Sequence, residues 1–180
     1  MSIQHGIKVP AHSEVKLGPE ELLDREKQKQ TLKFIRGNFL EIIVSIEQDI
    51  NHLIEKFLSI TDEKVKLIFK ERILLHRGMN LSWKSEFFKS LIEKKETLPK
   101  ERLDILVIAL DNLISERNKW AHGTIHYKQE ENRKLQSYLE YINSKGILSE
   151  LKLTNEYFDK LNEDLEKLEA LLREIEKKLT

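Results

Sequence analysis

Three side chains with chemistry of their own lie close together in the segment Glu116–Gly123, which reads ERNKWAHG. Arg117 carries a permanent positive charge, His122 can take up or release a proton near neutral pH, and Asn118 can orient either one through hydrogen bonds. RNA supplies its own nucleophile, the 2′-hydroxyl. Its cleavage needs a base at that hydroxyl, an acid at the leaving oxygen and positive charge at the phosphoryl oxygens. These residue types fit those roles, and we expect no metal ion and no cofactor.

The spacing of Arg117 and His122 restricts how they act together. Five residues turn a helix by about 140° and advance it by about 7.5 Å, so one straight helix does not aim both at one phosphate. Convergence needs a bend, an early helix end at Gly123, or a second copy of the helix across a two-fold axis. In the simplest alternative, Arg117 pairs with an acid such as Glu41 or Glu47, and His122 only caps its helix.

Side chains suited to holding RNA surround this motif. Lysines neutralise phosphates and aromatic rings stack on unpaired bases. We therefore predict an RNA-binding set consisting of Lys119, Trp120, His126, Tyr127 and Lys128. Trp120 suits a core position equally well, and the lysines suit a solvated face. A zinc pair of His122 and His126 is not expected, because Gly123 would end the helix between them.

Apolar side chains recur at three- and four-residue steps along most of the chain and predict helices. The first runs over 31–59 and the second over 61–78. A third begins at a Ser82 cap, and a fourth, opened by Pro99, carries the motif. A heptad stripe over 158–179 predicts a last helix, which packs either within the chain or against a second copy.

The segment 124–154 lacks this clear pattern. Thr124–Tyr127 and Ile147–Leu153 partly alternate and predict a small hairpin, whereas the apolar residues of 135–142 have helical spacing. Residues 1–28 show no sustained period, so we predict an extended or loosely ordered N-terminal arm before a helical domain over 29–180. The predicted fold class is all-α, an antiparallel up-and-down helical bundle with a small irregular or hairpin excursion before the last helix.

The composition excludes several classes of protein. The 180 residues contain no cysteine, which excludes a disulfide scaffold, a thiol nucleophile and a thiolate metal site. The 31 basic and 31 acidic residues balance, so any RNA binding must come from a local patch. The longest apolar run, Ile105–Leu110, is far shorter than the roughly 20 residues of a membrane span. Without a visible secretory signal, we expect a cytoplasmic protein.

The motif Arg117-Asn118-x3-His122, within R-N-x-x-A-H-G, resembles the Arg-x(4–6)-His signature of the HEPN superfamily. The resemblance covers roughly residues 31–179, and only the motif is specific. It implies a helical bundle that forms a homodimer, with the motif helices of two chains at a shared cleft. It also implies a metal-independent endoribonuclease that leaves a 2′,3′-cyclic phosphate. In this reading His122 is the base or acid, Arg117 stabilises the phosphate, and Asn118 supports both.

The resemblance further implies a role as a toxin or antiviral-defence effector, with a cognate antitoxin or defence-system partner. Some toxin members have a tyrosine two residues after the histidine, which a partner nucleotidyltransferase modifies. This chain has Thr124 there and its nearest tyrosine is Tyr127, so that subtype is not expected. Other members have lost activity. The alternative function is therefore a non-catalytic helical module that binds RNA or a partner protein.

Overall fold

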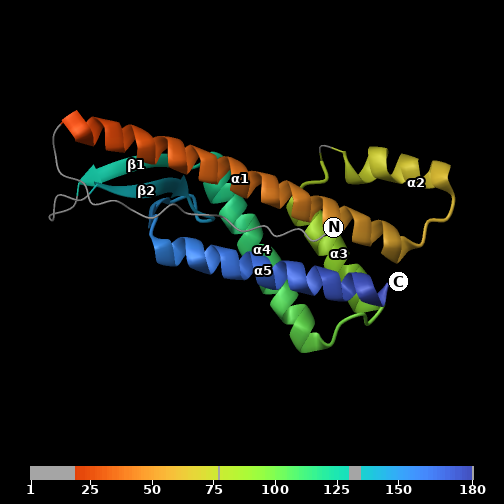
Figure 1. The fold of residues 1–180 in the computed structure, drawn as a ribbon. Coiled ribbons are helices and arrows are strands. Elements are labelled where there is room, and N and C mark those ends of the chain that lie inside the picture. Colours follow the sequence, from red (N-terminus) through yellow and green to blue (C-terminus); the bar gives the residue numbers. More distant parts are fainter. Residues whose placement is uncertain (1–18, 77, 130–134, 180) are drawn as a thin grey trace. The chain divides into compact units, whose positions relative to one another are not determined.

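The computed structural model describes residues 19–76, 78–129 and 135–179, and Figure 1 labels the five α-helices and strands β1 and β2. The helices are α1 (Pro19–Leu58), α2 (Glu63–Phe69), the π-helical turn η1 (Lys70–Leu74), α3 (Leu81–Lys94), α4 (Lys100–His122) and α5 (Asn155–Lys178). The strands are β1 (Thr124–Gln129), β2 (Leu135–Ile142) and β3 (Leu148–Lys152). The fold is mostly helical with one small sheet, so it is α+β, and the strictly all-α prediction is wrong.

Except for the first, which begins well before the predicted residue 31, the helices begin and end near the predicted residues. α1 begins at Pro19, whose fixed φ suits a first helical turn, so the predicted arm is helical from this residue onward. The remainder of that arm lies outside the described residues. Asn80, and not Ser82, caps α3, because its side-chain oxygen accepts a hydrogen bond from the Trp83 amide at 3.0 Å. In the part of the chain that the structure describes, no helix is long and apolar enough to cross a membrane.

The segment before α5 forms a three-stranded antiparallel sheet in the order β1-β2-β3. The two predicted strands are confirmed, but they do not form a hairpin with each other, because β2 lies between them and pairs with both. The helical alternative for 135–142 is wrong. In β2, Ser137 and Leu139 are buried while Tyr138 between them is only partly buried, which is the alternation of a strand. Strand pairing on both sides decides the conformation of β2, because it satisfies backbone groups that local spacing does not take into account.

The described residues form two compact units. The first combines the chain up to Ile42 with Ser115–Glu163, and the second combines Ile43–Ile114 with Asp164–Thr180. In the first unit Trp120 is fully buried and packs against Phe39 and Phe158, with ring centroids 6.0 and 6.1 Å away. The second unit contains an edge-to-face pair of Phe57 and Phe88 at 5.9 Å.

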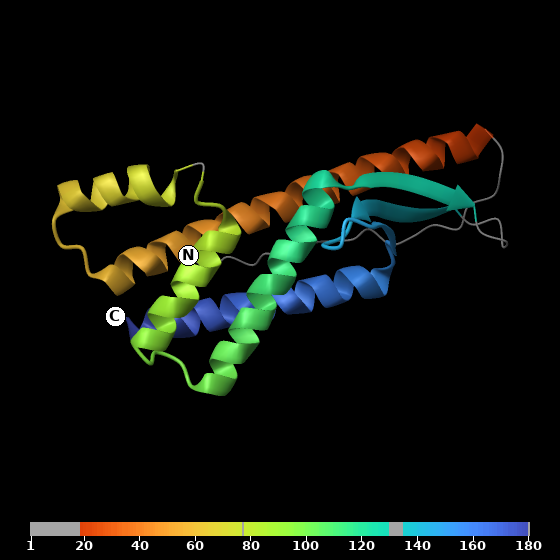
Figure 2. The same cartoon turned by 180° about the vertical axis from the view of Figure 1, so that it is seen from behind.

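The heptad stripe of α5 is buried within this single chain. Its buried members are Phe158, Leu161, Leu165, Leu168, Leu172 and Ile175. Packing within the chain is therefore the alternative that the structure supports. α2 behaves differently, since none of its residues is buried and its apolar side chains Val65, Leu67 and Ile68 are 52–60% exposed. This short helix (yellow in Figure 2) follows the loop after α1.

The chain passes from α4 directly into β1 through Gly123 (Figure 2). A Cβ atom at this position would lie 2.4 Å from the Lys119 carbonyl oxygen and 2.8 Å from the Glu140 carbonyl oxygen. Both are backbone atoms and do not move aside easily. Gly123 is therefore required because the end of α4 and strand β2 approach each other closely.

The substitution Gly123→Ala should lower the free energy of unfolding by about 1–3 kcal/mol, because the new methyl group overpacks this approach. Urea denaturation measures the change. Gly37→Ala is the matched control: nothing lies within 4 Å of a Cβ there, and the position is inside α1. That control should stabilise the protein by up to about 1 kcal/mol. Equal effects of the two substitutions would contradict the steric account of Gly123.

Candidate functional site

The motif residues lie in the last two turns of α4. Arg117 is half-buried, and its Nη1 donates a long hydrogen bond of 3.4 Å to Oδ1 of Asn118. Asn118 and His122 are exposed. Among the described residues, Arg117 has no other hydrogen-bond or ion-pair partner and His122 has none. Glu47, one of the two acids named as possible partners of Arg117, binds Lys84.

α4 continues as a helix through His122, so Arg117 and His122 remain about 140° apart around its axis. The predicted helix end at Gly123 is confirmed, but it comes after His122 and does not turn His122 toward Arg117. The polar stripe expected beside the apolar one is present, because Asp111, Ser115, Asn118 and His122 are all exposed. Within one chain, α4 therefore presents His122 and Asn118 on one face and Arg117 at the edge of that face.

Arg36 of α1 holds the C-terminal end of α4. Its Nη2 donates to the Ala121 carbonyl oxygen at 2.8 Å and its Nη1 to the Gly123 carbonyl oxygen at 3.3 Å. The last carbonyls of a helix lack partners in the helix and carry partial negative charge, so a guanidinium is well suited to this position. Arg36 thus fixes the backbone on both sides of His122.

A chain of hydrogen bonds joins the same turns of α4 to the start of α5. Trp120 Nε1 donates to the Tyr157 hydroxyl oxygen at 2.7 Å, and that hydroxyl donates to Glu116 Oε2 at 2.6 Å. Lys119 Nζ donates to the other oxygen of Glu116 at 2.5 Å. Burial, followed by the charge and the hydrogen bond of Glu116, raises the pKa of Tyr157 far above its usual range. Tyr157 therefore remains a proton donor to Glu116.

This chain of hydrogen bonds decides the place of two predicted RNA-binding residues. Trp120 is 0% exposed and belongs to the core, so it has no free face for a base in this conformation. Lys119 is bound to Glu116 and lies over the ring of Tyr141, 5.4 Å from its centroid.

Tyr127, a third predicted RNA-binding residue, is half-buried beneath Arg25, whose guanidinium carbon lies 5.7 Å from the centre of the tyrosine ring. Burial raises the pKa of its phenol.

The remaining predicted residues, His126 and Lys128, lie on the sheet. Side chains alternate along a strand, so His126 and Lys128 of β1 share a face with Tyr138 of β2 and Glu150 of β3. Leu139, on the opposite face, is completely buried. The outer face of the sheet is hereafter the surface formed by His126, Lys128, Tyr138, Glu140, Glu150 and Lys152.

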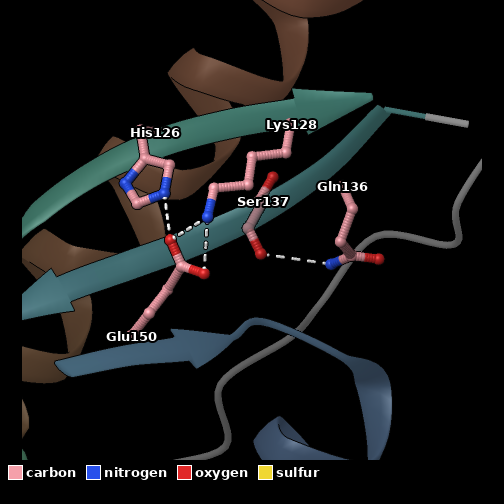
Figure 3. Close-up of polar contacts among 5 residues, drawn as sticks. All are labelled: His126, Lys128, Gln136, Ser137 and Glu150. Carbon is pink, nitrogen blue, oxygen red and sulfur yellow. Dashed lines mark hydrogen bonds and ion pairs between the residues drawn. The ribbon is translucent and has the colours of Figure 1, made fainter. Parts of the chain in front are cut away.

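Two donors of the outer face converge on one carboxylate, as Figure 3 shows. His126 Nε2 and Lys128 Nζ both lie 2.6 Å from Oε1 of Glu150, and Lys128 also contacts Oε2 at 2.7 Å. Tyr138 lies beside both donors, with its ring nearly parallel to that of His126 at 5.8 Å and its centroid 5.1 Å from Lys128 Nζ. Lys128 first, and His126 after it, lower the pKa of Glu150.

Among the described residues, no three histidine or acidic side chains are grouped as a metal site requires. Comparison with protein-family models, with curated proteins and with solved structures finds no match for this chain. What the chain does must therefore be argued from the geometry of its residues.

Sequence reasoning missed four residues of this region. Glu116 and Tyr157 hold the motif turns, Arg36 caps them, and Glu150 binds the two predicted cations of the sheet. Glu116 precedes the motif directly, so its position was a usable signal. Arg36 lies 85 residues before its partner Ala121, and no periodic pattern connects the two.

We expect Tyr157→Phe to lower the free energy of unfolding by about 1–3 kcal/mol, since Trp120 and Glu116 lose their common partner. The pH dependence changes as well. The raised pKa of Tyr157 means that the unfolded chain ionises this phenol above pH 10.0 while the folded chain does not, so wild-type stability falls there. The variant should lose that part of the decline.

Urea denaturation at several pH values measures both effects of Tyr157→Phe. Tyr141→Phe is the control, because it keeps the ring that lies beneath Lys119 and should change stability by less than about 0.5 kcal/mol. A Tyr157→Phe protein as stable as this control would contradict the structural role of the hydroxyl.

Proposed function

We propose that this chain is a metal-independent endoribonuclease of the HEPN type, acting as a toxin or antiviral-defence effector. The observation that carries the proposal is the state of the motif: Arg117 has no carboxylate partner among the described residues, and His122 is exposed without one. A cation without an acidic partner at the surface of a protein with balanced charge is available for a phosphate.

The acid nearest to the motif in the chain is kept away from Arg117. Both oxygens of Glu116 are engaged, one by Tyr157 and the other by Lys119. Successive residues of a helix point in different directions, and these two donors hold the carboxylate on the side of α5 and Lys119. Glu116 therefore does not pair with the guanidinium of Arg117, which can bind an anionic ligand.

The chemistry that we propose uses the 2′-hydroxyl of RNA as nucleophile. A neutral His122 accepts the proton of that hydroxyl as its oxygen attacks phosphorus. A protonated histidine donates a proton to the departing 5′-oxygen, and the other product is a 2′,3′-cyclic phosphate. Arg117 stabilises the negative charge that builds up on the phosphoryl oxygens, and Asn118 orients the guanidinium.

One chain supplies only one motif histidine, so we propose that a second copy supplies the other. Since α4 is helical up to His122, a two-fold axis between two chains would bring two histidines and two arginines to one phosphate. α4 also exposes two apolar side chains, Ile105 at 47% and Ile108 at 61%, which a second copy would cover.

A second candidate function is a non-catalytic module that binds a partner protein. The exposed apolar side chains of α2, Val65, Leu67 and Ile68, favour this reading, because soluble chains rarely leave such a group uncovered. The two candidates differ in one observable, since only the nuclease cleaves RNA.

Incubating the purified chain with single-stranded RNA in EDTA tests the proposal. Wild type should cleave and leave 2′,3′-cyclic phosphate ends. Arg117→Ala and His122→Ala should each reduce the rate by about 100-fold or more, which is the usual cost of losing one such group. Denaturing gels and end-group analysis by mass spectrometry give both readouts.

Matched controls change the same residue types elsewhere. Arg102→Ala removes an arginine of α4 that binds Glu174, and His52→Ala removes an exposed histidine of α1. Both controls should retain the wild-type rate. Cleavage that persists in His122→Ala, or a strictly monomeric mass in light scattering at the concentrations of the assay, would refute the shared site.

A further inference from the structure

We propose that the outer face of the sheet is a binding site for single-stranded RNA, in which Glu150 occupies the place of a phosphate. This inference deepens the proposed function, since it names the surface that holds the strand beside the site of cleavage. It is carried by the contacts of His126, Lys128, Tyr138 and Glu150.

Two donors of the outer face converge on one acceptor atom. The imidazole nitrogen of His126 and the ammonium of Lys128 meet at a single oxygen of Glu150, each at 2.6 Å. A phosphoryl oxygen is an anionic acceptor of similar size, and it accepts from the same donors at similar distances. The two side chains are therefore already placed as an anion site, and Glu150 is its internal ligand (Figure 3).

The internal ligand, Glu150, is held weakly. Glu150 is exposed, and ion pairs between exposed groups contribute little to stability because water screens them. Glu150 also lies directly opposite Glu140 in the register of β2 and β3. Like charges in such a pair repel each other, which further favours the departure of Glu150 when an external anion arrives.

Tyr138 is half-exposed beside the two donors, with His126 at 5.8 Å and Lys128 Nζ at 5.1 Å from its centroid. A ring beside a phosphate site is the arrangement that proteins use for an unpaired base and its backbone. Duplex RNA keeps its bases stacked inside, so this face is suited to a single strand.

The test measures binding of a fluorescent single-stranded 2′-O-methyl oligoribonucleotide by anisotropy. This probe lacks the free 2′-hydroxyl, so the proposed nuclease cannot cut it, and binding is measured independently of cleavage. Glu150→Gln should bind about fivefold more tightly than wild type, because the internal competitor is weakened. His126→Ala and Lys128→Met should each bind more weakly.

Glu140→Gln is the matched control, because it removes the same charge from the neighbouring strand on the same face. It should improve binding much less than Glu150→Gln does. Lys128→Met should also reduce the salt dependence of the binding constant by about 0.7 in its logarithmic slope, as expected for one lost phosphate contact to a single strand. Tyr138→Leu should weaken binding of the normal probe but not that of an abasic one.

Equal affinities of Glu150→Gln and Glu140→Gln for the probe would overturn the inference. Glu150 would then only form a structural ion pair between β1 and β3. Weaker binding by Glu150→Gln would overturn it also. The cleavage assay with ordinary RNA is separate: if wild type binds the probe as expected but cuts no RNA, the proposed nuclease fails and the binding site stands. If wild type cuts RNA but Glu150→Gln and Glu140→Gln bind the probe with equal affinity, the proposed binding site fails and the proposed nuclease stands.

Discussion

The C-terminal turns of α4 are fixed by one close approach of backbone to backbone, and the candidate site depends on it. Gly123 allows the end of the helix to lie against strand β2 where any side chain would collide with two carbonyl oxygens. Arg36 then binds the carbonyls on both sides of His122, and Trp120 fills the core beneath. Loss of that approach would free the turns that carry Arg117 and His122. Their placement would then be lost, even though the residues themselves are unchanged.

The second organising feature is the distribution of charge around these turns. The acids closest to the motif and to the sheet donors each have defined partners: Glu116 binds Tyr157 and Lys119, and Glu150 binds His126 and Lys128. Arg36 is directed at helix carbonyls. Arg117 differs from these cations, because among the described residues it has neither an acid nor a backbone carbonyl as partner and makes only a long hydrogen bond to Asn118. In a chain with zero formal net charge, such local differences decide where an anion binds.

The two proposals draw on different parts of this arrangement. The nuclease proposal rests on helix α4, where a titratable imidazole and a permanent cation lie five residues apart. The RNA-binding proposal rests on the strands that follow, where a carboxylate holds two donors together. The direct connection from α4 to β1 through Gly123 places both within a short stretch of chain.

How well each feature could be predicted depends on how far apart in the sequence its interacting residues lie. Periodic apolar residues indicated the long helices, because a helix repeats within a few residues and its buried stripe is visible in the sequence. The strand β2 was ambiguous for the same reason, since Leu135, Leu139 and Ile142 fit a helix until two neighbouring strands pair with the segment. The exposure of α2 contradicts its apolar pattern, which indicated a core face that no described part of the chain covers.

The sequence by itself determined the helix that carries the motif, the order of Arg117, Asn118 and His122 along it, and the polar stripe that leaves the last two exposed. All three follow from the helical repeat and from residue types. Only the tertiary structure decided that Arg36 caps the helix, that Trp120 is core, that Tyr157 and Lys119 engage Glu116, and that Glu150 lies between His126 and Lys128. Several of these contacts join residues about 20 to 90 positions apart, and a partner at that distance is selected by the packing of the whole unit and not by local spacing.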